Sequence, residues 1–396
     1  MIQSICILGR QPALGLAELE SLYGSKLVSP VGTHAAGVDL PARDIDFARL
    51  GSITRLANVL GEVPSTNWKM IEKALTSLAR SSALNLPASG KFHLGLSAIG
   101  FDVSPAKLGA TGLTLKKVIR SRYEGSVRLA PNVTAELSTA QVFHNNLTDA
   151  NGCELLIIAQ GNTTIVARTI TVQDIDSYTL RDRGRPRRDA RVGMLPPKLA
   201  QLIVNLATGP ADISEVTVLD PFCGTGVILQ EAMLMGYRTY GSDLEPRMIN
   251  YSEANLAWFT ETYELPSNSA YKVEPGDATD HHWDIPQVAV ATETYLGRPF
   301  TGRPAPDILA QTVVEVNLIL KRFLQNLHPQ LKTGSRLCLA VPAWFINDEI
   351  KHPPIIASLE KLGFKRITFT HADATELIYH REEQIVGREL LVLESV

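Results

Sequence analysis

The run from Asp220 to Glu231 reads Asp-Pro-Phe-Cys-Gly-Thr-Gly-Val-Ile-Leu-Gln-Glu and directly follows the β-branched apolar stretch Val216 to Leu219. The pattern predicts a strand, a tight glycine turn and a helix, which together form a ligand cradle at the carboxyl end of a parallel sheet. Gly224 and Gly226 carry no Cβ, so the backbone can approach a ligand closely at both positions. The run therefore predicts an α/β domain with a small-molecule site at the end of one strand.

The carboxylate of Asp220 narrows the choice of small molecule. Phosphate-binding glycine loops avoid a negative charge here, whereas a ligand with a positively charged amino group, such as the methionine part of S-adenosylmethionine, suits it. A nicotinamide site would have a third glycine where Leu229 stands, and a Walker loop would have Gly-Lys-Ser/Thr, which is absent. A dinucleotide site and a plain βα turn remain as alternatives. The sequence Asp-Pro-Phe-Cys-Gly-Thr-Gly, residues 220–226, resembles motif I of class I methyltransferases that modify exocyclic amines of nucleobases.

The size and composition of the chain set broader limits. A chain of 396 residues is too long for one compact core and predicts two or three domains. No apolar run approaches the length of a membrane span, and the amino terminus lacks the pattern of an export signal. The four cysteines are far apart and form no CxxC pair, which argues against a zinc site or a disulfide framework. We therefore expect a cytoplasmic protein without metal. Because the net charge is −3, a nucleic-acid surface would have to be local.

The front half of the chain has mixed signals for helices and strands. Residues 1–62 and 63–175 are each predicted to form a small α+β unit, and a short arginine-rich segment, residues 176–193, follows them. The expected elements in the front half are helices over residues 14–23, 44–60, 68–83 and 114–123 and strands over residues 91–99, 153–159 and 164–169.

From residue 194 to residue 396, helical and strand patterns alternate strictly. Such alternation predicts a doubly wound, mostly parallel sheet with right-handed crossovers, which is a Rossmann-like fold. The last two strands, expected near residues 376–379 and 389–393, look like an antiparallel hairpin.

Two more acids follow the next two strands. Asp243 ends the second strand, where it can accept the ribose hydroxyls of an adenosine cofactor or cap the helix that follows. Asp277 ends the third strand, where class I methyltransferases place an acid on the adenine amine; a plain turn aspartate is the alternative. Acids at the ends of three successive strands favour a cofactor site.

The fourth strand leads into Glu293-Thr294-Tyr295, where amino-methyltransferases carry Asp/Asn-Pro-Pro-Tyr/Phe. An exocyclic amine is a poor nucleophile because its lone pair is delocalised into the ring. A side-chain oxygen and a backbone carbonyl accept its N–H bonds and turn the lone pair towards the methyl group, and the aromatic ring stacks on the base. Glu293 and Tyr295 can fill these roles, but both prolines are missing and the aromatic residue comes one position early. A loop with an ordinary glutamate is the alternative.

Basic residues concentrate in two places. Six arginines occur among the fourteen residues 178–191, with Gly184 and Pro186 preventing a regular helix there. Guanidinium groups bind phosphates in bidentate fashion, although an arginine-rich loop can also be a solvated linker. A basic helix over residues 114–123 adds a second group. The predicted RNA-binding residues are Lys116, Lys117, Arg181, Arg183, Arg185, Arg187 and Arg188.

Over its whole length the chain resembles the tRNA guanine-N2 methyltransferases with an amino-terminal THUMP domain, the group that acts on guanosine 10. The resemblance depends on the motif at Asp220, the segment Asp182 to Ala200, and the ending Tyr379 to Glu389. It implies a ferredoxin-like unit (1–62), a THUMP-like RNA-binding domain (63–175), an arginine-rich linker (176–193) and a class I methyltransferase domain (194–396).

The resemblance also implies roles for single residues. S-adenosylmethionine would bind to Asp220, Pro221, Phe222, Gly224, Gly226, Asp243, Leu244, Asp277 and Ala278. Glu293, Thr294 and Tyr295 would form the catalytic segment, without metal. The implied partner is tRNA, and a small activator subunit is left open. The departures at Glu293 to Tyr295 keep two alternatives open: a DNA amino-methyltransferase, and a tRNA-binding protein that is catalytically inactive or depends on a partner.

Overall fold

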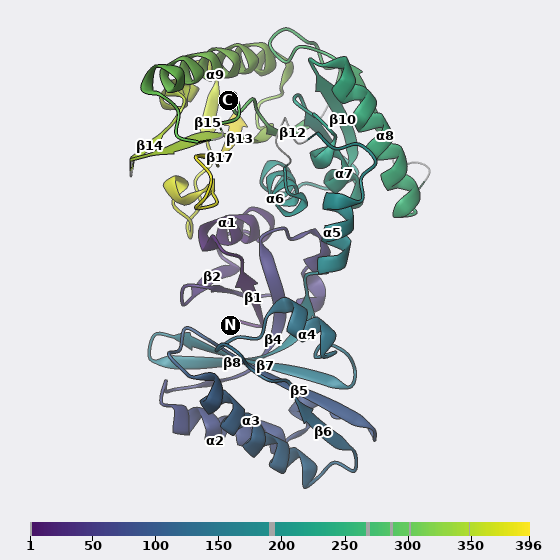
Figure 1. Cartoon of the computed structure of the whole chain (residues 1–396), viewed down its shortest axis with the longest axis vertical. Helices are drawn as coiled ribbons and strands as arrows, with labels where there is room; N and C mark the ends of the chain where they lie inside the picture. Colours follow the sequence, from purple (N-terminus) through teal and green to yellow (C-terminus); the bar gives the residue numbers. More distant parts are fainter. Residues whose placement is uncertain (1, 190–194, 267–269, 286–287, 301, 348) are drawn as a thin grey trace. The chain divides into compact units, whose positions relative to one another are not determined.

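The computed structural model describes residues 2–189, 195–266, 270–285, 288–300, 302–347 and 349–396. The chain divides into two compact units (Figure 1). The first unit comprises the residues up to Leu16, Gly24–Ala48 and Ile53–Ile175. The second comprises Ala17–Tyr23, Arg49–Ser52 and Asp176–Val396. Helix α1 (Pro12–Tyr23) therefore begins in the first unit and ends in the second.

The first unit is built on one mixed sheet with the strand order β2-β3-β1-β4-β8-β7-β5-β6. Strand β5 runs parallel to both of its neighbours, and the other pairs are antiparallel. The strands are β1 (Ser4–Leu8), β2 (Val28–Val31), β3 (Ala35–Val38), β4 (Ile53–Val63), β5 (Lys91–Ile99), β6 (Ser126–Leu129), β7 (Gly152–Gln160) and β8 (Thr163–Val172). The helices are α2 (Trp68–Arg80), α3 (Pro105–Arg120) and α4 (Thr139–His144), with short 3₁₀ turns at Ala42–Asp44, Phe47–Arg49 and Ser82–Leu84.

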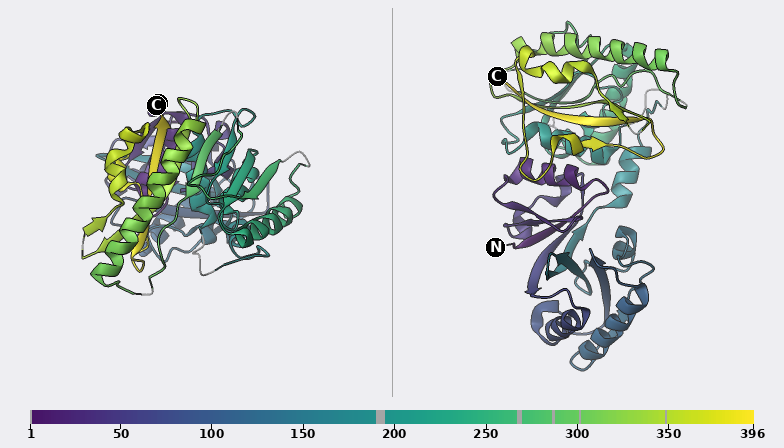
Figure 2. Two further views of the ribbon diagram at one scale, coloured as in Figure 1. Left: turned by 90° about the horizontal axis from the view of Figure 1, so that it is seen from above. Right: turned by 90° about the vertical axis from the view of Figure 1, so that its left-hand side faces the viewer.

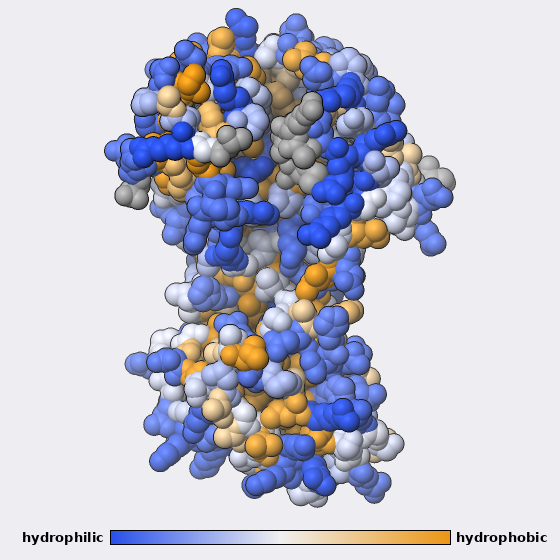
Figure 3. Space-filling view, viewed as in Figure 1, coloured by the Kyte–Doolittle hydropathy of each residue, from blue (hydrophilic) through white to orange (hydrophobic). Residues whose placement is uncertain are grey.

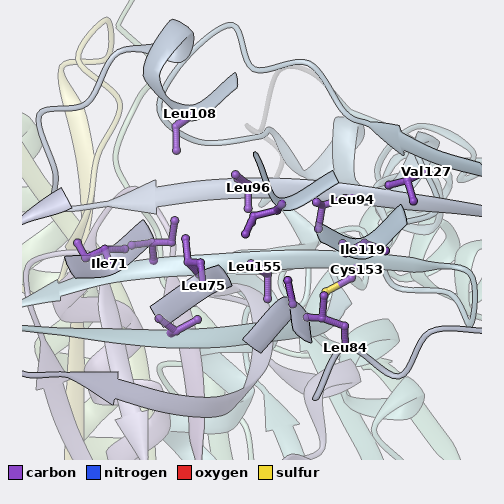
Figure 4. Packing of buried hydrophobic residues seen from close by; sticks show 14 of the residues in the cluster. Ile71, Leu75, Leu84, Leu94, Leu96, Leu108, Ile119, Val127, Cys153 and Leu155 are labelled. Carbon is purple, nitrogen blue, oxygen red and sulfur yellow. The ribbon is translucent and has the colours of Figure 1, made fainter. Parts of the chain in front are cut away.

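Helix α2 shows why this unit folds as it does. Its buried residues Ile71, Leu75 and Ala79 recur every four positions, so they lie on one face of the helix. That face packs on the sheet against Leu94 of β5 and Leu155 of β7 (Figure 4). The apolar face of the helix and the apolar side chains of the strands thus form one common core.

The predicted helix over residues 44–60 is wrong. The segment contains two 3₁₀ turns and the long strand β4, which pairs antiparallel with β1 on one side and with β8 on the other. Pairing with two strands that are distant in sequence overrides the local helical pattern. The expected boundary between residues 62 and 63 lies at the end of β4, in a sheet that continues across it.

The second unit contains the alternating region, and its sheet has the order β11-β10-β9-β12-β13-β17-β15. The first five strands are parallel, whereas β17 is antiparallel to β13, β15 and β16. The prediction of a doubly wound, mostly parallel sheet with an antiparallel last strand is confirmed. The strands are β9 (Thr217–Asp220), β10 (Arg238–Asp243), β11 (Tyr271–Pro275), β12 (Val288–Glu293), β13 (Arg336–Ile346), β14 (Glu349–Lys351), β15 (Phe364–Arg366), β16 (Ile378–Tyr379) and β17 (Val386–Ser395).

Helices cover both faces of this sheet (Figures 1 and 2). Phe323, Leu324 and Leu327 of α9 are fully buried against the strands on one face. On the other face, Met233 of α7 and Leu256 of α8 share a core with the glycine-loop residue Cys223. The helices are α5 (Ile175–Arg183), α6 (Pro197–Thr208), α7 (Val227–Leu234), α8 (Pro246–Thr262) and α9 (Pro306–Leu327), with 3₁₀ segments at His328–Gln330, Pro354–Leu362 and Ala374–Glu376.

Two amino-terminal segments belong to the second unit, and the buried carboxylate of Glu18 connects them. Glu18 accepts hydrogen bonds from the backbone N–H groups of Gly51 (2.9 Å) and Ser52 (3.0 Å). The side-chain amide of Asn205 on α6 donates a third, at 2.7 Å. Burial raises the pKa of Glu18, and these hydrogen bonds oppose the shift. Sequence patterns do not reveal this connection because its partners are far apart in the chain.

Most of the surface that Figure 3 shows is hydrophilic, and its hydrophobic residues occur in small groups. None of the helices in the described ranges has the length and apolar character needed to cross a bilayer.

Candidate active site

A cavity of about 1040 Å³ lies in the second unit, at the carboxyl ends of its parallel strands. The strand order reverses between β9 and β12, and doubly wound sheets bind their ligands at such a point. Its walls include all four acids that the sequence analysis places at strand ends: Asp220, Asp243, Asp277 and Glu293. The volume is at the upper end of the range for a single small ligand, which leaves room for part of a second one.

The glycine turn forms one wall of the cavity. Gly224 has a φ of +50° and Gly226 a φ of +82°, and both values lie in the left-handed region that favours glycine. A Cβ added to Gly226 would also lie 3.0 Å from the hydroxyl oxygen of Ser252. Helix α7 begins directly after Gly226. The turn thus requires glycine for its backbone conformation and directs the amino end of α7 towards the cavity wall.

Asp220 is a buried acid at the end of β9, with 2% of its surface exposed. Its Oδ1 accepts hydrogen bonds from the Thr292 hydroxyl at 2.6 Å and from the Phe222 backbone N–H at 3.2 Å. Burial raises the pKa of Asp220 to about 7, and these two hydrogen bonds only partly offset the shift. Burial disfavours the charged form of this carboxylate and a nearby cation favours it, so the site suits a ligand with a positively charged group.

Asp243 and Asp277 continue the same wall. Asp243 Oδ2 accepts from the Gly224 backbone N–H, and Oδ1 accepts from that of Glu245, both at 2.9 Å. Asp243 therefore braces the glycine turn, and burial raises its pKa. Asp277 Oδ1 accepts from the backbone N–H and the hydroxyl of Thr279, at 2.9 and 2.8 Å, as a turn aspartate does. Leu244 and Ala278, which follow the two acids, also line the cavity.

The end of β12 and the segment that follows it form the part of the wall next to Asp220. The Glu293 carboxylate pairs with the guanidinium of Arg388 on β17, with Oε1 and Nε 2.5 Å apart. Thr294 donates its backbone N–H and its hydroxyl to the Ala340 carbonyl, at 3.0 and 3.2 Å. Tyr295 is half-buried beside the apolar cluster that includes Trp344, and burial raises its pKa, with the charge of Glu315 adding to the shift. The predicted catalytic residues thus lie in the cavity. The Arg388 pairing could not be predicted from local sequence.

The arginine-rich segment has two kinds of residue. Arg181 is buried and pairs with Glu231 of α7 at 2.7 Å, while Arg185 is buried with its Nη1 3.5 Å from the Thr225 hydroxyl. These two guanidinium groups fasten the segment to the glycine turn and α7, so they present no surface to RNA. The exposed arginines of the run are Arg183, Arg187 and Arg188; Arg191 lies outside the described residues.

Arg247 is a basic residue that the sequence analysis missed. It lies on α8, lines the cavity, and pairs with Asp189 at 3.0 Å while half of its side chain stays exposed. Arg247 and Arg187 both lie over the ring of Tyr251, at 5.8 and 5.9 Å from its centre. The arginine-rich segment and α8 thus present a shared basic edge next to the cavity. In the first unit, Lys117 of α3 is exposed and Lys116 is half-buried.

The fold is similar to that of solved methyltransferases. TrmN from Thermus thermophilus matches with a TM-score of 0.51 and 17% identity, covering all of both chains. A structure described as a possible methylase from Clostridium difficile 630 matches with a TM-score of 0.51 and 12% identity, covering 100% of this chain and 98% of the other. Both likenesses show the methyltransferase-like α/β fold.

Sequence comparison identifies the family. Residues 181–254 match a family model described as DNA methylase. A tRNA (guanine(10)-N2)-dimethyltransferase of Methanothermobacter thermautotrophicus is 36% identical over 151 residues, or 38% of this chain and 39% of the relative. One of the same description from Pyrococcus abyssi is 30% identical over 295 residues, or 72% of this chain and 77% of the relative. The chain belongs to the tRNA (guanine(10)-N2)-dimethyltransferase family.

Proposed function

We propose that the protein is a methyltransferase that uses S-adenosylmethionine to methylate the exocyclic N2 amine of a guanine in tRNA. The relatives are named for guanine 10, which makes this nucleotide the first candidate target. The observation that carries the proposal is that a buried carboxylate, Asp220, and a paired carboxylate, Glu293, end the neighbouring strands β9 and β12 in one cavity. The first suits a cationic cofactor and the second suits an amine.

The residues present fit S-adenosylmethionine. Asp220 can pair with the ammonium group of the methionine part, and Asp243 keeps lone pairs for the ribose hydroxyls. Asp277 and Ala278 also line the cavity and would hold the adenine. The positive φ values of Gly224 and Gly226 allow the backbone to approach the cofactor closely. When bound, the cofactor supplies an electrophilic methyl group on a sulfonium sulfur.

Glu293 and its neighbours would prepare the amine. The carboxylate accepts an N–H hydrogen bond from N2, which orients the nitrogen lone pair for direct in-line attack. Tyr295, half-buried against an apolar cluster, offers a fixed ring on which an extruded base can stack. The two hydrogen bonds from Thr294 to the Ala340 carbonyl hold the segment in place where related motifs have prolines.

Binding of tRNA would use the exposed basic residues. Arg247 lines the cavity and shares the ring of Tyr251 with Arg187, while Arg183 and Arg188 are exposed on the same segment as Arg187. Lys117 and the half-buried Lys116 provide basic side chains in the THUMP-like part of the first unit. Guanidinium groups bind phosphates in bidentate fashion, so these residues fix the RNA backbone while the cavity selects the base.

The double substitution Arg183→Gln/Arg188→Gln is expected to weaken tRNA binding uniformly and to lower the salt dependence. Each lost phosphate contact should reduce the slope of log K against log salt by about 0.7 to 0.9. Affinity for the cofactor should not change. Titration of tRNA at several salt concentrations measures the slope. Arg238→Gln is the matched control, because Arg238 is exposed at the opposite, amino-terminal end of β10.

The decisive test is transfer of labelled methyl groups from S-adenosylmethionine to unmodified tRNA, followed by nucleoside analysis. The proposal expects N2-methylguanosine or N2,N2-dimethylguanosine, and mapping then identifies the nucleotide. Transfer to duplex DNA in competition with tRNA would support a DNA methyltransferase instead. Binding of both cofactor and tRNA without transfer would indicate either a missing activator subunit or a binding protein without catalysis. Addition of cell extract from the source organism separates these two cases.

A further inference from the structure

We propose that Arg388 is a positioning residue that holds Glu293 in place as an oriented hydrogen-bond acceptor. The inference rests on the proposed function of the cavity and extends it to a residue on a different strand. The two side chains are 95 positions apart in sequence, yet their atoms Oε1 and Nε are 2.5 Å apart. Both residues line the cavity.

The sheet itself brings the pair together. Glu293 ends β12, and its backbone is in register with Ala340 of β13. Arg388 lies on β17, in register with Pro342 of the same central strand. The guanidinium therefore reaches across β13 to the carboxylate. Because both side chains come from strands of one sheet, their separation is set by the backbone and not by a loop.

The contact between Arg388 and Glu293 is largely shielded from water. Arg388 has 9% of its surface exposed, and the Glu293 side chain has 16%. The attraction between opposite charges is stronger where water is excluded than at the surface. Arg388 thus restrains the position and direction of the Glu293 carboxylate, whose oxygens accept hydrogen bonds from N–H donors.

The ion pair between Glu293 and Arg388 also compensates for the two prolines that this segment lacks. In the Pro-Pro form of the motif, ring constraints fix the acceptor. Here Glu293 has a longer side chain than Asp or Asn and no adjacent proline, so it needs another restraint. The Nε contact of Arg388 supplies this restraint, and the second carboxylate oxygen remains for the substrate amine. The cavity is also lined by the charged residues Asp220, Asp243, Glu245, Arg247, Asp277, Arg298, Glu315, Arg322 and Glu383.

A second ion pair on β17 offers a matched control. Glu389, the next residue, is buried and pairs with Arg366 of β15 and with His352. Successive side chains of a strand point to opposite faces, and neither Glu389 nor Arg366 is among the residues that line the cavity. Arg366→Met therefore removes an arginine from a buried carboxylate on the same strand without touching the site.

The test compares Arg388→Met, Arg388→Lys and Arg366→Met in kcat for methyl transfer to tRNA and in affinity for S-adenosylmethionine. We expect Arg388→Met to lower kcat by roughly 10²-fold while the affinity for S-adenosylmethionine stays within about twofold. Arg388→Lys, which keeps the positive charge, should restore part of kcat. Arg366→Met should keep the wild-type kcat.

Different outcomes separate the two proposals. A wild-type protein that binds the cofactor but methylates no tRNA guanine overturns the proposed function itself. An active wild type together with an unaltered kcat in Arg388→Met overturns only the role of Arg388. If Arg388→Met does not fold, the pair Glu293→Gln and Glu293→Gln/Arg388→Met decides: the double variant should be no slower than the single one, because Arg388 acts through Glu293. Independent, multiplicative losses would contradict the inference.

Discussion

Asp220→Asn is expected to weaken binding of S-adenosylmethionine by between about 10- and 150-fold, the effect of losing one hydrogen bond to a charged group. The amide has nearly the same shape and can still accept from the Thr292 hydroxyl, which lies 2.6 Å from Oδ1 in the wild type. The substitution therefore removes the negative charge and little else. Calorimetric titration of the cofactor into both proteins measures the difference.

The same carboxylate predicts how affinity depends on pH. Burial raises the pKa of Asp220 to about 7 in the free protein, so protons compete with the cofactor's ammonium group below this value. Affinity should rise as pH increases towards about 7 and fall again above about 8, where an α-amino group loses its own proton. Binding at pH 6 should release close to one proton, which titrations in buffers of different ionisation heat detect. In Asp220→Asn the acid limb should disappear.

Asp212→Asn serves as the control for both measurements. Asp212 is exposed and lies just before the amino end of β9, whereas Asp220 ends the same strand at the cavity. It should bind the cofactor like the wild type. A wild-type affinity that is flat between pH 5 and 7, or an Asp220→Asn variant that binds normally, would contradict the assignment of Asp220 to the ammonium group.

The architecture of the second unit could be predicted from the sequence because its signals are local. Each βα step has its own apolar strand pattern and its own helical periodicity. The pattern of the last two strands also predicted the antiparallel pairing of β17 with β16. Strand β4 of the first unit lacked such a signal. Its conformation depends on two strands, β1 and β8, and β8 is more than a hundred residues away, so local pattern alone suggested a helix there.

A similar division applies to the site. The acids Asp220, Asp243 and Asp277 could be located because each lies at or just after the end of a strand, and the ends of parallel strands meet at one edge. The sequence pattern could not separate the buried arginines of the basic run from the exposed ones. Arg181 and Arg185 belong to the same basic run as Arg187, but only the fold shows that the first two are buried with partners on or next to α7. The exposure of a charged side chain depends on distant contacts that spacing does not encode.

Glu293→Gln is expected to lower kcat for guanine methylation by roughly 10²- to 10³-fold while leaving cofactor affinity unchanged. The amide keeps the length of the side chain but loses the charge, and Arg388 loses its ionic partner at 2.5 Å. Single-turnover methyl transfer with saturating cofactor and tRNA measures the chemical step. Glu349→Gln, an exposed carboxylate on β14, is the control and should retain the wild-type rate. Equal losses of kcat and of cofactor affinity would exclude a role for Glu293 that is confined to the amine.

A substrate analogue tests the Glu293 carboxylate by changing the target base instead of the side chain. In guanine the N2 amine stands beside the N1–H donor, so an acceptor-only carboxylate can bind both groups; in 2-aminopurine the neighbouring N1 is itself an acceptor and faces the carboxylate with its lone pair. The wild type should therefore methylate tRNA with 2-aminopurine at the target position much more slowly than the natural tRNA. Because an amide can also donate, Glu293→Gln should reduce this preference. If the variant prefers guanine over 2-aminopurine as strongly as the wild type does, the carboxylate orients the amine without contacting N1. Guanine is then selected by another part of the cavity.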